Sequence, residues 1–202
     1  MQKIFIAAGS VLVVVLLGIG IYFSIQKPTE RVDSENHRME MAPASSPENA
    51  AYMLNGIHVE LKNGQAEVEA APGSASKIVT KIFGNELKTD LTGDGREDVA
   101  FILVQSSGGS GTFYYAVAAL NTKDGWMGSD GYLLGDRIAP QATTLSPNPK
   151  QKGVVVFNYA ERGAHEPMTT PPSIGKSVYL KLDPQTMQWG IVLPNFEGES
   201  NR

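Results

Sequence analysis

The 202-residue chain contains no cysteine, which excludes both a disulfide-stapled fold and a lipoprotein anchor. Histidine is nearly as scarce: the chain has three, His37, His58 and His165, and none belongs to an H-E-x-x-H zinc-binding pattern. Basic residues form no patch and do not alternate with aromatic residues, and the net charge is -4, so we expect no nucleic-acid partner. The absence of an internal repeat also argues against a β-propeller.

One long hydrophobic run is present, at the N-terminus. No charged residue occurs from Ile4 to Ile25, and these 22 residues would span roughly 33 Å as a helix, enough for a bilayer core of about 30 Å. The run is longer than the apolar part of a signal peptide, and Ser24–Pro28 offers no A-x-A cleavage pattern. We predict an uncleaved transmembrane anchor over residues 1–27, with the lipid bilayer as its partner; a cleaved signal peptide is the alternative.

The orientation of this anchor depends on two signals that disagree. Lys27, Arg31 and Arg38 lie after the run, and the positive-inside rule counts them against export of the C-terminal part. The short N-terminal flank with its single Lys3 is instead typical of a signal anchor, which exports the C-terminal part of its chain. We expect a single-pass cell-membrane protein whose C-terminal domain is extracytoplasmic.

The rest of the chain divides into a linker, a domain and a tail. Residues 28–49 are polar and contain three prolines, which predicts a flexible linker. Residues 50–193 are predicted to be a β-rich domain, and residues 194–202 a frayed tail. Ile57–Leu61 and Ala66–Ala70 alternate apolar with polar residues around Asn63-Gly64, which predicts a β-hairpin.

The segment Lys77–Phe83 fits either a helix or a strand, and Gly84 is predicted to end it in both cases. Further strands are predicted at Val99–Val104, Phe113–Leu120, Tyr132–Leu134, Val154–Tyr159, Ser177–Leu182 and Gln188–Val192. The first two are continuous apolar runs, which indicates strands in the centre of the fold. Short strands separated by Gly, Pro and Asn turns predict one antiparallel β-sandwich or partly open barrel.

Asp90–Asp98 is the segment that most sharply indicates chemistry. It places carboxylates at loop positions 1, 5 and 9 around a glycine at position 6. Calcium requires such clustered oxygen ligands on a tightly curved backbone, so we predict a weak calcium site. Its ligands would be the side chains of Asp90, Thr92, Asp94 and Asp98 and the main-chain carbonyl of Arg96. The alternative is a solvated turn in which the aspartates bond to their own backbone.

Position 12 of this loop is Phe101 instead of a bidentate glutamate, so the loop is not an EF-hand. It resembles the calcium loops of dockerin and of FG-GAP or VCBS-type extracellular β modules, over the nine loop residues and the apolar strand after them. Thr92 departs from that pattern, because Asp or Asn is usual there and a hydroxyl is a weaker ligand.

A second resemblance covers about residues 49–182. Gly109–Tyr115, Leu134–Pro140 and Asn158–Met168, together with Phe83–Asn85, are similar to an uncharacterised family of bacterial membrane-anchored or exported proteins. This resemblance implies an envelope setting but no particular activity.

These patterns together favour an envelope protein whose domain is a binding or structural module, with an envelope protein or a glycan as partner. One alternative is an envelope hydrolase that uses His165 with a serine or a carboxylate, since catalytic triads assemble through space. Ser106–Gly111 lacks both the Gly-x-Ser-x-Gly elbow and the Gly-Lys-Ser/Thr phosphate loop. The other alternative is an inhibitor or chaperone-like accessory that docks a partner through this glycine-rich loop.

Overall fold

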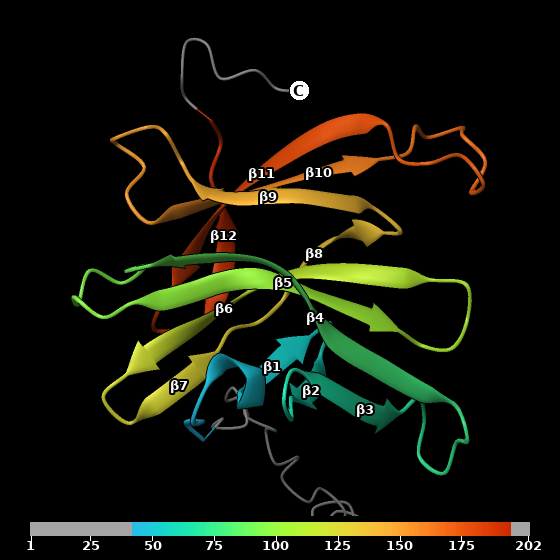
Figure 1. The fold of residues 1–202 in the computed structure, drawn as a ribbon, viewed down its shortest axis with the longest axis horizontal. Helices are drawn as coiled ribbons and strands as arrows, with labels where there is room; N and C mark the ends of the chain where they lie inside the picture. The colour runs from blue at the N-terminus through green and yellow to red at the C-terminus, as the bar shows by residue number, and fades with distance from the viewer. Residues whose placement is uncertain (1–41, 195–202) are drawn as a thin grey trace, which may run out of the picture. The chain divides into compact units, whose positions relative to one another are not determined.

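The computed structural model describes residues 42–194, which form a mainly β domain (Figure 1). The strands within each sheet pair antiparallel, which confirms the predicted fold class at this level. A short 3-10 helix, η1 (Pro47–Asn49), comes before the strands. The strands are β1 (Ala51–Leu54), β2 (Ile57–Glu60), β3 (Gln65–Glu69), β4 (Lys77–Thr89), β5 (Asp98–Ser106), β6 (Thr112–Thr122), β7 (Gly125–Gly128), β8 (Tyr132–Asp136), β9 (Ala139–Leu145), β10 (Val154–Glu161), β11 (Ile174–Asp183) and β12 (Gln188–Ile191).

The largest sheet has the order β3-β4-β5-β6-β7, and β8 also pairs with β6. Its two central strands, β5 and β6, are covered on both faces. Val99, Phe101 and Leu103 enter one hydrophobic core, whereas Ala100 and Ile102 enter another. This alternation explains the continuous apolar runs: because both faces of the sheet are buried, neither set of alternate residues has to be polar. The predicted central strands are confirmed.

A second sheet, β12-β11-β10-β9, covers one face of the large sheet (Figure 1). The core between the two sheets includes Val155, Phe157, Leu180 and Met187, all with an exposed fraction of 1% or less. Phe157 packs edge-on against Trp189 with ring centroids 6.0 Å apart. The two sheets therefore face each other across a hydrophobic core in a sandwich-like arrangement.

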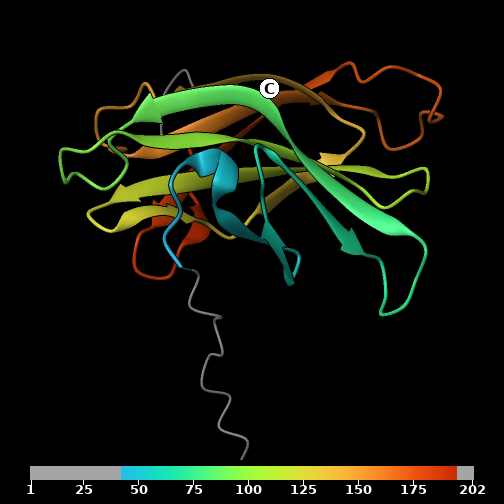
Figure 2. The ribbon, with the colours of Figure 1, turned by 60° about the horizontal axis from the view of Figure 1, so that its bottom comes forward.

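The hairpin β1–β2 covers the opposite face of the large sheet, in front of it in Figure 2. Asn55 and Gly56 form its turn with φ values of 50° and 78°, the left-handed conformation that a two-residue hairpin turn needs. The buried ring of Tyr52 meets Phe101 edge-on at 5.8 Å, and its hydroxyl donates to the Pro47 carbonyl at 2.8 Å. β1 also forms a parallel bridge to Asp130, so the hairpin is tied to the sheet by backbone as well as by packing.

The predicted hairpin around Asn63-Gly64 is wrong in its pairing. The turn itself is present, since Lys62 and Gln65 exchange two backbone hydrogen bonds across it. Beyond that bridge the flanking strands separate: β2 pairs with β1, and β3 pairs with β4. The correct hairpin partner of β2 is β1, a strand that the sequence pattern did not reveal.

Two further predictions require correction. Gly84 does not end the segment that begins at Lys77, because β4 continues to Thr89 through a bulge in which Gly84 has φ 116° and Asn85 has φ 54°. The predicted linker extends too far toward the C-terminus. Ala44 forms a backbone bridge with Trp126, and the main-chain carbonyl of Glu48 accepts the Gly64 N–H at 2.8 Å. Residues 44–49 therefore belong to the folded domain.

The predicted anchor (residues 1–27), most of the predicted linker and all but Pro194 of the predicted tail lie outside the described residues. No helix among residues 42–194 has the length and apolar character needed to cross a membrane.

Candidate functional site

The Asp90–Asp98 loop connects β4 to β5, and Asp90 organises its first half. One carboxylate oxygen, Oδ1, accepts the backbone N–H groups of Thr92, Gly93 and Asp94 at 3.1, 2.6 and 3.2 Å, and Oδ2 accepts that of Gly95 at 2.8 Å. Gly93 and Gly95 have φ values of 84° and 85°, which a side chain would oppose and which turn these N–H groups toward Asp90. The hydrogen bonds, that from Gly95 first, hold the pKa of Asp90 below its ordinary value.

Asp94 and Arg96 pair with each other at the exposed tip of the loop. Asp94 Oδ1 accepts the Arg96 backbone N–H at 2.8 Å, and Asp94 Oδ2 forms an ion pair with the Arg96 guanidinium. The same guanidinium donates to the carbonyl of Asn121 at the end of β6. Arg96, predicted as a carbonyl ligand, thus uses its side chain to tie the loop to the neighbouring strand.

Asp98, the last predicted ligand, is buried at the start of β5, with 1% of its surface exposed. Its Oδ2 accepts the Leu91 N–H and its Oδ1 accepts the Asn121 N–H, both at 2.9 Å. Burial raises the pKa of Asp98, although the two hydrogen bonds oppose this shift. Asp98 therefore clamps the loop entrance and the end of β6 to β5.

The loop carboxylates do not converge on one point in the structure. Asp90 faces its own backbone N–H groups, Asp94 faces Arg96, and Asp98 faces the sheet. Among residues 42–194, no three Asp, Glu or His side chains are grouped so that they could hold a metal ion as they stand. A calcium ion would have to draw Asp94 away from Arg96, so calcium binding stays a prediction that rests on the sequence pattern.

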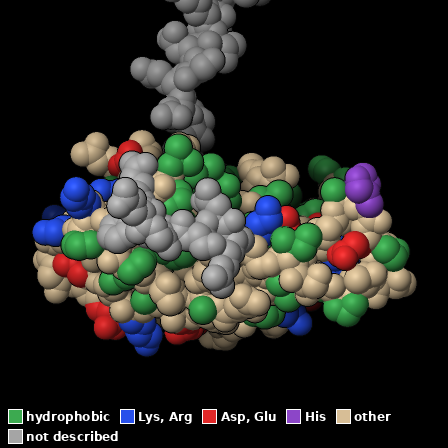
Figure 3. All heavy atoms as spheres, turned by 90° about the horizontal axis from the view of Figure 1, so that it is seen from above, with side chains coloured by type: hydrophobic (Ala, Val, Ile, Leu, Met, Phe, Trp, Pro, Cys, Tyr) green, Lys and Arg blue, Asp and Glu red, His purple; other side chains and the backbone are tan. Residues whose placement is uncertain are grey.

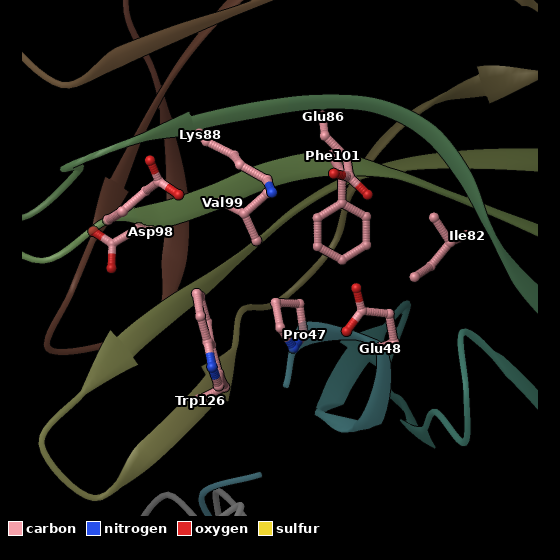
Figure 4. A pocket seen from close by; sticks show the side chains of 10 residues that line it. Pro47, Glu48, Ile82, Glu86, Lys88, Asp98, Val99, Phe101 and Trp126 are labelled. Atoms are coloured by element: carbon pink, nitrogen blue, oxygen red, sulfur yellow. The ribbon is translucent and has the colours of Figure 1, made fainter. Parts of the chain in front are cut away.

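A pocket with room for about 140 Å³ lies directly beside this loop (Figure 4). Glu97 and Asp98 belong to both the loop and the pocket wall. The pocket opens between β4 and β5 on one side and η1 and β7 on the other, as Figure 4 shows. Its apolar lining consists of Pro47, Ile82, Val99, Phe101 and Trp126.

The rim of this pocket is acidic. The lining includes Glu48 from η1, Glu86 from β4 and Glu97 from the loop, and it has a single basic residue, Lys88. In Figure 4 the carboxylates of Glu48 and Glu86 point toward the Phe101 ring from opposite sides. None of these four exposed charged residues belongs to an ion pair formed within residues 42–194. Their charges are therefore available to a ligand.

The sequence pattern did not reveal this pocket, because its walls come from four segments that are distant along the chain. The one local signal is the alternation of Glu86 and Lys88, which places both side chains on one face of β4.

No hydrogen bond within residues 42–194 joins the His165 side chain to a serine or a carboxylate, and the hydrolase hypothesis stays a prediction. His165 is exposed in the connection between β10 and β11, and it forms no side-chain hydrogen bond within the described part of the chain. Ser110 is exposed in the β5–β6 connection. His58 lies beside a shallow groove between β2 and β3.

Charged residues at the ends of β8 and β10 form contacts that hold neighbouring segments together. Asp136 accepts the Thr112 N–H at 2.7 Å and binds the Arg137 guanidinium at 2.6 Å, and Arg162 donates to the Arg137 carbonyl at 2.7 Å. The Arg137 hydrogen bond is the main cause that holds the pKa of Asp136 below its ordinary value. Glu161 pairs with Lys176 at 3.1 Å. These contacts fix the glycine-rich connection to β8 and β10.

On the visible part of the outer face of the β9–β12 sheet, hydrophobic, acidic and basic side chains are interspersed (Figure 3). We take the acidic loop and its adjacent pocket as the candidate site, because they combine clustered carboxylates with an apolar lining. Comparison of the chain with protein-family models, with curated proteins and with solved structures finds no match in any of the three.

Proposed function

We propose that the domain is a binding module whose pocket beside the acidic loop receives a cationic group on a short apolar stem. The observation that carries this proposal is the contrast between the apolar lining, with the buried Phe101 and the partly buried Trp126, and the exposed carboxylates of Glu48, Glu86 and Glu97. Aromatic rings attract cations, and carboxylates on a partly enclosed rim add to that attraction.

The size of the pocket limits the group that can enter. Its volume of about 140 Å³ is close to that of an engineered cavity of about 150 Å³ that binds benzene. A butyl or pentyl amine, or the side chain of a lysine on a partner protein, has a suitable size. We place this module in the bacterial envelope, anchored through residues 1–27 and exported. That setting rests on the sequence pattern, and the partner would be an envelope protein that presents a basic side chain.

Titration with three five-carbon ligands tests the pocket. In a Trp189→Phe variant, Trp126 is the one remaining tryptophan of the chain, so its fluorescence reports on the pocket. We expect n-pentylamine to change the emission saturably, n-pentanol to bind more weakly and pentanoate not to bind, because only the amine satisfies both the lining and the rim.

Two charge variants provide matched controls for this titration. Glu86→Gln should weaken amine binding up to about fivefold, and Lys88→Gln should strengthen it by a similar factor, since an exposed charge contributes about 0–1 kcal/mol. Equal affinity for amine and carboxylate, or no response to either variant, would contradict a cation-binding pocket.

We also propose that the Asp90–Asp98 loop binds calcium weakly, from the ligand pattern alone. With a Kd of about 0.1 mM and about 1 mM calcium, binding would add roughly 1.4 kcal/mol to stability. We expect calcium to raise the melting temperature of the protein, Asp94→Ala to abolish the rise, and Asp124→Ala, outside the loop, to retain it. Identical melting curves in calcium and in chelator would refute the site.

A further inference from the structure

The strands β2 and β3 leave the Asn63-Gly64 turn and then part, which opens a groove of about 420 Å³ between them. Lys62 and Gln65 form the bridge at its closed end, with N···O distances of 2.8 and 3.3 Å. Within the described residues, β2 pairs with β1 alone and β3 pairs with β4 alone. Each strand thus presents one unpaired edge to the other across the groove.

The hydrogen-bond pattern shows which backbone groups lie on these edges. In the β1–β2 hairpin, Leu54 and Ile57 flank a two-residue turn, and the Leu61 N–H donates to the Ala50 carbonyl. Because successive backbone N–H groups of a strand point to opposite sides, the N–H groups of His58 and Glu60 point away from β1. In β3–β4, Ile82 donates to Gly64 and Ala70 donates to Ser76. The same alternation directs the amide of Glu67 away from β4, toward the groove.

Charge opposes closure of the two strands on each other. Continuing the register of the Lys62–Gln65 bridge would place Glu60 directly opposite Glu67. Like charges in directly opposed positions destabilise a strand pair. Both carboxylates are exposed, and neither belongs to an ion pair within residues 42–194. A strand placed between them with a cation at this level would remove the repulsion and satisfy both backbone edges.

We propose that this groove binds an extended segment of a partner protein that adds a strand between β2 and β3 and places a lysine or arginine between Glu60 and Glu67. Strand addition to an exposed sheet edge gives affinity through main-chain hydrogen bonds and specificity through alternate side chains. Here both walls offer such edges, so the added strand joins the β1–β2 hairpin to the large sheet. This site is separate from the pocket at the acidic loop and does not depend on it.

Binding of short peptides to the full-length protein tests the groove. The probe is acetylated and amidated Thr-Val-Thr-Lys-Thr-Val-Thr, and the matched control carries Glu in place of Lys. We expect the Lys peptide to bind at least fivefold more tightly, and to slow hydrogen exchange at His58, Glu60 and Glu67. In the Glu60→Lys, Glu67→Lys double variant the preference should reverse toward the Glu peptide.

Three results would overturn this proposal. Equal affinity of the two peptides, or protection that falls outside β2 and β3, would show that the groove does not select an added strand. Protection of the same amides without peptide, increasing with protein concentration, would assign the groove to a second copy of the chain. Protection without peptide and independent of concentration would assign it to another segment of the same chain.

Discussion

Replacement of Asp98 by alanine should lower the free energy of unfolding by about 2–6 kcal/mol. The carboxylate accepts the N–H groups of Leu91 and Asn121, both at 2.9 Å, in a place where Asp98 is 1% exposed. Alanine would leave two N–H donors without an acceptor, and each buried unsatisfied donor costs about 1–3 kcal/mol. Chemical denaturation of the variant and of the original protein measures the difference.

Asp94→Ala is the matched control for this prediction. Asp94 lies in the same loop, but 34% of its side chain is exposed and its ion pair with Arg96 is at the surface. In the presence of a calcium chelator, its replacement should change stability by about 0.5 kcal/mol or less. A loss at Asp98 no larger than the loss at Asp94 would show that the clamp between the loop and β6 contributes little.

The pH dependence of the Asp98→Asn variant tests which effect dominates at this carboxylate. Because burial raises the pKa of Asp98 in the folded protein, the stability that comes from this pKa difference is complete below the unfolded pKa of about 3.9. That contribution is lost as the pH rises through the folded pKa. The stability gap between the original protein and Asp98→Asn should therefore narrow from pH 4 upward. A gap that widens would show that the two backbone hydrogen bonds outweigh the cost of burial.

The central strands of the fold could be predicted from the sequence. A strand that is buried on both faces is a continuous apolar run, which can be recognised without knowing which strands pair with it. The runs Val99–Val104 and Phe113–Leu120 are apolar at every position or nearly so, and they are the strands with neighbours above and below. Edge strands leave no such signal. β9 is half exposed and contains Pro140, a residue that sheets tolerate at their edges, and it was not predicted.

The pairing of strands was harder to predict than their positions. A turn is encoded by adjacent residues, whereas the partner of a strand can come from a distant part of the sequence. Asn55-Gly56 and Asn63-Gly64 are the same dipeptide with the same left-handed conformation, yet only the first closes a hairpin. At the second, each strand pairs with an outer neighbour instead, and closing the hairpin would bring Glu60 opposite Glu67.

The same difference between contiguous and distant residues decides which parts of the candidate site were predicted. The loop was found because its residues are contiguous, and the structure shows how Asp90 and Asp98 are used in it. The pocket could not be found, because Glu48, Glu86 and Trp126 are brought together by the docking of η1 and β7 against β4 and β5. No sequence pattern encodes that juxtaposition.

Replacement of Gly128 by alanine should destabilise the domain by at least about 3 kcal/mol, the upper end of the cost of overpacking. A Cβ atom on Gly128 would lie 2.2 Å from the carbonyl oxygen of Ala51 and 2.7 Å from the Tyr52 ring. The first contact is with backbone, so no side-chain rotation relieves it, and β1 has to move away from β7. That movement would pull Tyr52 out of the core in which it contacts Phe101. Urea unfolding measures the loss.

Gly175→Ala separates this steric effect from the general cost of changing a glycine in a strand. A Cβ atom on Gly175, in β11, would meet nothing within 4 Å. Its replacement should therefore be neutral or slightly stabilising, because alanine loses less backbone entropy on folding. Hydrogen exchange adds a local readout: in Gly128→Ala the amides of β1 should exchange faster than those of β10. Equal stability of the two variants would mean that β1 can dock without close approach to Gly128.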